Sequence, residues 1–209
     1  MCHAVNTMKS KLIKWFLRLA ILIWPLYWLG QIFIGDLGAS PALTLSRELG
    51  FIVLTLLTAN IVLGILLDLL KPAPSWIRFW VSERRWWGIV SFLVLVIHVA
   101  FYFVNEGFEA QAWIQIFTKT YLIFASISFF LLFLLAITSN NFSTRRLGPK
   151  RWKMLHRLIY LVQFLIMGHV LLIEKANLRL YIPWLLLLGA AQIIRWSVHF
   201  WRSYKTTRA

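Results

Sequence analysis

The sequence has a single cysteine, Cys2, and this scarcity excludes several kinds of chemistry. One cysteine cannot form an intramolecular disulfide, and no Cys-x-x-Cys-His motif is present for covalent haem attachment. The same count excludes an iron–sulfur cluster held by protein thiolates and a thiolate-ligated haem. The sequence also lacks a glycine-rich dinucleotide motif, so any nicotinamide oxidation must take place on another protein.

Charged residues are scarce as well. They make up 14% of the 209 residues, whereas 60% of the residues are hydrophobic, which leaves too little polar surface to cover a soluble globule. The longest polar connections, of about 15 residues, are too short to fold as a separate domain. The first apolar stretch begins near Phe16 and has no small-residue cleavage site, so we expect it to stay as an anchor. The composition therefore predicts an integral membrane protein.

Acidic residues number only 7 against 22 Lys and Arg, which gives a formal charge of +15. The basic residues gather at the N-terminal flank, in the second and fourth connections and at the C-terminal end. The alternate connections hold only Arg47, Lys119, Lys175 and Arg179. By the positive-inside rule, both termini and the even-numbered connections face the cytoplasm. Because the membrane explains this charge pattern, nucleic-acid binding is not expected.

Six apolar segments have the length of about 20 residues that a membrane-spanning helix needs. They lie near residues 16–34, 49–67, 86–104, 121–138, 154–173 and 180–195. Short connections containing Gly38, Pro41, Pro72 and Pro149 separate several of them. The sequence therefore predicts an all-α integral membrane protein, with one six-helix transmembrane domain over residues 1–209 and both termini in the cytoplasm.

Two histidines, His98 and His169, lie inside long uncharged segments. Counted from the cytoplasmic face at the helical rise, His98 lies roughly 18 Å deep and His169 roughly 22 Å deep. Ionisable residues in a membrane span usually mark a functional site. Two imidazoles at one depth can hold a single haem iron from both sides. The alternative is that each histidine only forms a hydrogen bond between helices.

His156 lies nearer the cytoplasmic face, in a basic run. On an ideal helix, its spacing from His169 places the two side chains roughly 140° apart. For both to meet haem, the helix must bend or change its winding near Gly168, or tilt, or the two histidines must have different neighbours. His156 is therefore either a ligand of an inner or shared haem or an interfacial residue. Whether one haem or two are bound stays open.

Basic residues near the inner edge also have two interpretations. They set the topology, or they pair with haem propionates or a flavin phosphate, because guanidinium suits planar anions. These residues are Arg84, Arg85, Arg145, Arg146 and Arg151.

Several sequence runs resemble a known family. They are Arg84-Arg85-Trp86-Trp87-Gly88 leading to His98, Thr118 to Tyr121, Thr138-Ser139 and, most specifically, the stretch from Arg146 to Tyr160 followed by His169. Together they resemble the MsrQ (YedZ) family over roughly residues 10–205. That family supplies the haem-binding membrane subunit of the bacterial periplasmic methionine sulfoxide reductase system, within the wider ferric-reductase-like transmembrane group.

The resemblance implies that His98, His156 and His169 occupy haem-ligand positions, with Arg84, Arg85 and Arg151 as further cofactor-binding candidates. It implies a cytochrome of the bacterial inner membrane that contains one or two b haems. Electrons would come from quinol in the quinone pool, or from reduced flavin such as FMN. They would pass to a periplasmic molybdopterin-containing methionine sulfoxide reductase that repairs oxidised proteins.

The sequence departs from the family pattern in two outer connections. Gly38-Ala39-Ser40-Pro41 has no aspartate before the proline, and Val170 to Lys175 is less typical. These departures concern partner contacts more than the haem. Two rival interpretations stay open, namely a stand-alone ferric or quinone reductase of the same group, and a haem-free transporter or assembly factor.

Overall fold

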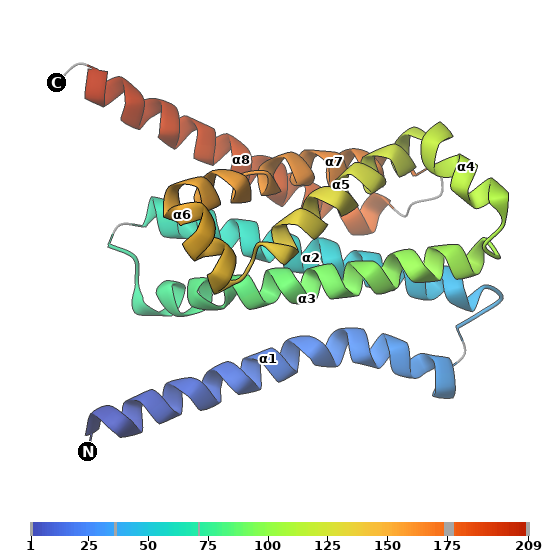
Figure 1. Ribbon diagram of the computed structural model, residues 1–209, viewed down its shortest axis with the longest axis horizontal. Coiled ribbons are helices and arrows are strands. Elements are labelled where there is room, and N and C mark those ends of the chain that lie inside the picture. The colour runs from blue at the N-terminus through green and yellow to red at the C-terminus, as the bar shows by residue number, and fades with distance from the viewer. Residues whose placement is uncertain (1, 36, 71, 174–177, 208–209) are drawn as a thin grey trace. The chain divides into compact units, whose positions relative to one another are not determined.

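The computed structural model describes residues 2–35, 37–70, 72–173 and 178–207, and side chains between residues 12 and 201 of these ranges. Within these ranges the chain forms eight helices and no strand (Figure 1). They are α1 (Cys2–Ile34), α2 (Pro41–Leu69), α3 (Ser75–Asn105), α4 (Ala110–Thr118), α5 (Thr120–Ile137), α6 (Asn141–His156), α7 (Ile159–Leu171) and α8 (Leu178–Thr207). The basic residues Lys71, Lys175 and Arg208, and part of the predicted outer segment from Val170 to Lys175, lie outside the described residues.

The prediction of an all-α protein with six membrane spans is confirmed. Among the described residues, six helical segments are long and apolar enough to cross a bilayer: 12–34, 41–69, 75–105, 120–137, 141–171 and 178–201. Large apolar side chains such as Phe16, Phe33 and Phe130 are exposed on these segments, as expected of helices that face lipid. The chain is therefore a multi-pass membrane protein.

Two predicted connections are in fact helical. α3 begins at Ser75, so Arg84 and Arg85 lie within a helix and not in the second connection. The fourth connection, predicted as a loop around Gly148 and Pro149, is helix α6. Near a bilayer a helix satisfies the backbone hydrogen-bonding groups, and long basic side chains can still reach water from it.

The fifth predicted span, over 154–173, lies largely within the membrane-crossing segment 141–171, but that segment is two helices and not one. Its first residues belong to α6, which ends at His156, and α7 begins only at Ile159. Between them the backbone tightens, because the amides of Arg157, Leu158 and Tyr160 bond to carbonyls three residues back. The winding thus changes at this joint, whereas α7 is continuous through Gly168, where a bend was expected.

The backbone contacts divide the chain into two compact units. The first contains Met1–Val53 and Leu93–Phe108, and the second contains Leu54–Phe92 and Glu109–Ala209. In the first unit, Leu45, Leu49 and Ile52 of α2 are buried. The Trp24 ring of α1 meets the Phe51 ring of α2 edge to face, with 6.1 Å between centroids.

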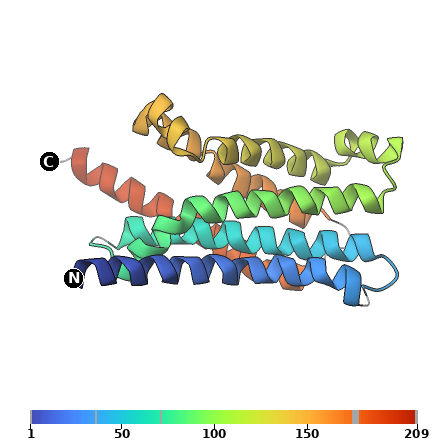
Figure 2. The ribbon, with the colours of Figure 1, turned by 60° about the horizontal axis from the view of Figure 1, so that its bottom comes forward.

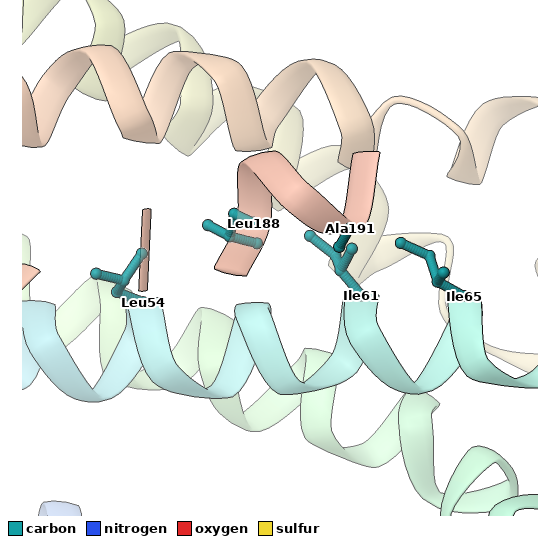
Figure 3. Packing of buried hydrophobic residues seen from close by; sticks show 5 residues of the cluster. All are labelled: Leu54, Ile61, Ile65, Leu188 and Ala191. Atoms are coloured by element: carbon teal, nitrogen blue, oxygen red, sulfur yellow. The ribbon is translucent and has the colours of Figure 1, made fainter. Parts of the chain in front are cut away.

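In the second unit α5 packs along α7, α4 packs against α5, and α7 also contacts α8. Figure 2 shows α6 turning away from the direction of α5. A cluster of buried apolar side chains from α2 and α8 forms part of the core (Figure 3). Its members are Leu54, Ile61, Ile65, Leu188 and Ala191. This packing holds α7, the helix that carries His169, against α5 and α8.

A buried amide pair links α7 to α8 in the same unit. Gln163 Nε2 donates to the carbonyl of Leu188 at 3.0 Å, and Gln192 Nε2 donates to Gln163 Oε1 at 2.5 Å. Both glutamines are buried. Polar side chains that bond across helices in this way hold membrane bundles together, because lipid offers them no alternative partner.

Candidate functional site

His98 is anchored in the first unit by a backbone carbonyl of α2. Its Nδ1 lies 2.6 Å from the carbonyl oxygen of Ser46, and the Ser46 hydroxyl in turn donates to the carbonyl of His98 at 3.2 Å. Because a carbonyl can only accept, Nδ1 carries the proton and the lone pair lies on Nε2. Gly50, one turn further along α2, allows the ring to approach the helix backbone closely.

His169 is anchored in the same manner in the second unit. Its Nδ1 lies 2.9 Å from the carbonyl oxygen of Tyr121, at the start of α5. The Tyr121 ring lies beside the imidazole, with 6.0 Å between centroids. The carbonyl again fixes the tautomer, so the lone pair of His169 also lies on Nε2.

This arrangement is the one that metal-bound histidines use. A ligating histidine almost always donates its other ring N–H to a carbonyl, carboxylate or water, which fixes the tautomer and orients the ring. Ser46 and Tyr121 contribute their backbone carbonyls, so the sequence could not identify them as the hydrogen-bond partners of the two histidines. His98 and His169 belong to different units, and their pairing on one iron stays a prediction.

His156 has different surroundings. Its ring stacks on Trp152 with 4.0 Å between centroids, and its Nε2 lies 3.3 Å from the hydroxyl oxygen of Thr138. Trp152 donates its ring N–H to the backbone carbonyl of Thr138 at 2.9 Å. The end of α5 therefore positions both aromatic rings of α6, and Nε2 of His156 faces a hydroxyl.

The predicted arginines occupy three different environments. Arg84 Nε donates to Asn60 Oδ1 at 2.7 Å, and the Asn60 amide donates back to the carbonyl of Arg84 at 3.0 Å. Arg85 donates to Asn141 Oδ1 at 2.6 Å and lies over the Trp152 ring at 5.7 Å. Arg151 is exposed on α6.

The structure thus brings Arg85 and His156 to the same tryptophan. Sequence analysis missed this function of Trp152, because tryptophans near span ends usually act as interfacial anchors. Among the described residues, no three His, Cys, Asp or Glu side chains gather into a site for a bare metal ion. A haem iron needs fewer protein ligands, since the porphyrin provides four nitrogens and the protein only the axial ones.

The helices and the anchored imidazoles define the class: a helical multi-pass membrane protein in which two histidines of the spans donate Nδ1–H to backbone carbonyls of neighbouring helices. Residues 49–167 match the family described as the ferric reductase like transmembrane component. This segment includes His98 and His156 and ends two residues before His169.

A relative from Rhodospirillum rubrum, the protein-methionine-sulfoxide reductase heme-binding subunit MsrQ, is 36% identical over 160 residues. These residues are 74% of this chain and 73% of the relative. The chain belongs to the MsrQ family of ferric-reductase-like transmembrane proteins.

Proposed function

We propose that this chain is a haem b electron-transfer subunit of the bacterial inner membrane. The observation that carries the proposal is the shared geometry of His98 and His169, whose Nδ1 atoms donate to the helix carbonyls of Ser46 and Tyr121. Haem b, when bound, supplies the one-electron chemistry. The chain's own contribution is to present two neutral Nε2 atoms in fixed orientation and to exclude water through apolar helices.

The donor in this proposal acts on the cytoplasmic side and is quinol from the membrane pool or reduced flavin such as FMN. Five exposed basic residues of α6 suit the phosphate of a flavin, because surface guanidinium and ammonium groups attract phosphate. They are Arg145, Arg146, Lys150, Arg151 and Lys153. The acceptor is a periplasmic molybdopterin-containing methionine sulfoxide reductase, as the name of the Rhodospirillum rubrum relative suggests in part.

His156 is proposed as the axial ligand of a second, inner haem. Its Nε2 lies 3.3 Å from the Thr138 hydroxyl, so a haem held by His156 would have to displace this contact. A ratio of haem to protein, measured by pyridine haemochrome, separates one haem from two. The His156→Ala variant should lower a ratio near two and leave a ratio near one unchanged.

The decisive experiment compares the absorption spectra of purified variants. His98→Ala and His169→Ala should each remove or shift most of the Soret band, because each removes an axial ligand. His199→Ala, which changes an exposed histidine of α8, is the matched control and should keep the spectrum. Unchanged spectra in both ligand variants would contradict the assignment, and no Soret band in the wild type would favour a haem-free transporter.

Reconstitution tests the partner. In vesicles loaded with quinol or supplied with reduced FMN, the rate of haem reoxidation should rise when the periplasmic reductase and methionine sulfoxide are added together. A stand-alone ferric or quinone reductase would be reoxidised at the same rate without that partner.

A further inference from the structure

Arg195 stacks on the Tyr160 ring in the second unit, and we call these two residues together with Arg84 the Arg195 cluster. Arg195 comes from α8, Tyr160 from the first turn of α7 and Arg84 from α3. The guanidinium carbon of Arg195 lies 3.4 Å from the centroid of the Tyr160 ring. At that distance a planar guanidinium lies flat on the ring, so its N–H bonds point outward from the ring edge.

One of those donors has no acceptor. The Nη1 atom of Arg195 is buried and has no hydrogen-bond partner among the described residues. A stacked tyrosine ring attracts the charge but does not accept in-plane N–H bonds. A buried charged donor without an acceptor is costly, particularly in a membrane protein. The geometry therefore points to an acceptor that a ligand supplies.

Arg84 adds a second positive group to the cluster. Its guanidinium is held by Asn60 and packs directly against Gly64, where an added methyl carbon would come within 2.8 Å of Nη1. Tyr160 packs against the apolar cluster that includes Ile61 and Ile65 of α2, and Arg84 bonds to Asn60 on the same stretch of that helix.

We propose that Arg195 binds a carboxylate of haem b, a propionate, through Nη1, with the Tyr160 ring as its platform and Arg84 as a supporting charge. This inference rests on the proposed function, because haem is the carboxylate-bearing ligand of that function. Arginine is suited to the task since its donors match the spacing of carboxylate oxygens. A lipid phosphate offers the same chemistry and is the rival source of the anion.

The test is a titration of the full-length chain, produced without haem, with haem b and with its dimethyl ester. The ester has the same ring and iron but no carboxylates. Wild type should bind haem about tenfold or more tightly than the ester, as expected for a charge-assisted hydrogen bond. In Arg195→Gln the ratio should fall to about one through weaker binding of haem alone.

Two further variants make the result specific. Arg195→Lys keeps the charge but not the flat stacking, and it should give an intermediate ratio even if the glutamine variant folds poorly. Arg18→Gln removes another arginine that lies over an aromatic ring, Trp15 at 5.9 Å, from α1 in the first unit. This matched control should keep the wild-type ratio.

Three outcomes would overturn the inference: a wild-type ratio near one, a wild-type ratio retained in both Arg195 variants, or loss of bound phospholipid phosphorus from Arg195→Gln with an unchanged ratio. The last would assign the site to a lipid phosphate. Failure of the proposed function looks different, because wild type would then bind neither haem nor its ester.

Discussion

His98 and His169 are held in the same manner, each by a carbonyl of a neighbouring helix. Hydropathy and position alone identified both residues, because an ionisable group in an apolar span is rare and informative. The sequence could not predict their partners, since every residue carries a backbone carbonyl. Arg195 illustrates the same limit. A basic residue is expected at the end of the last span by the positive-inside rule, and only the tertiary structure shows that it stacks on Tyr160.

The Gly50→Ala substitution should disturb His98 without touching the histidine itself. An added Cβ would lie 2.9 Å from Cε1 and 3.0 Å from Nδ1 of the His98 ring, so the ring must move and its bond to Ser46 must lengthen. We expect roughly a tenfold loss of haem affinity, the scale on which changes to the partners of a ligand act. A haem titration of the purified chain measures the loss.

Gly30→Ala is the control for that substitution, because nothing lies within 4 Å of a Cβ at Gly30. Both substitutions replace a helical glycine in the first unit by alanine. Equal affinities for the two variants would show that the ring of His98 is not constrained by α2.

At the scale of elements, the six spans were predictable because each is a long uncharged run. Hydropathy did not predict the places where a helix bends or is interrupted, because these depend on local backbone geometry. α6 contains Gly148 with φ 76° and ψ 154°, directly before Pro149, so two helical pieces meet at a kink. The short helix α4 between α3 and α5 was also missed, since nine residues are too few for a clear periodic pattern.

Gly148→Ala should destabilise the protein through this kink. The backbone conformation of Gly148 is one that only glycine adopts readily, so alanine should cost roughly 1–3 kcal/mol. The second piece of α6, with Trp152 and His156, depends on this geometry. Thermal unfolding of the detergent-solubilised chain should show a lowered midpoint.

Gly189→Ala in α8 is the comparison, because no atom lies within 4 Å of a Cβ there. That change should leave the midpoint equal or raise it, since alanine favours a helix by about 1 kcal/mol over glycine. A midpoint for Gly148→Ala at or above that of Gly189→Ala would argue against the kink.

For the whole molecule, the distribution of basic residues predicts the orientation in the membrane. The N-terminal flank, α6 and the C-terminal end are rich in Lys and Arg. Only Arg47, Lys119, Lys175 and Arg179 fall in the segments predicted to lie outside. With six spans, both termini lie on one side of the membrane, and the charge distribution predicts that this side is the cytoplasm.

Thiol labelling tests the orientation, because Cys2 is the only cysteine. A membrane-impermeant maleimide should label Cys2 in inverted inner-membrane vesicles and leave it unlabelled in intact spheroplasts. The double variant Cys2→Ser with Glu109→Cys places the thiol at an exposed position before α4 and should label in spheroplasts only. The reverse pattern for both chains would mean that the positive-inside rule fails for this protein.

The sequence by itself determined the membrane class, the helical fold, the six spans and the choice of His98 and His169 as candidate ligands, because hydropathy, segment length and the rarity of ionisable groups are properties of the chain itself. The tertiary structure alone decided the tautomers of His98 and His169, the stacking of His156 on Trp152 and the buried donor of Arg195. These depend on backbone carbonyls and ring faces that meet only when separate helices pack. The sequence of a helix gives the residues that it contains. The neighbouring helices determine which hydrogen bonds the polar atoms of those residues form.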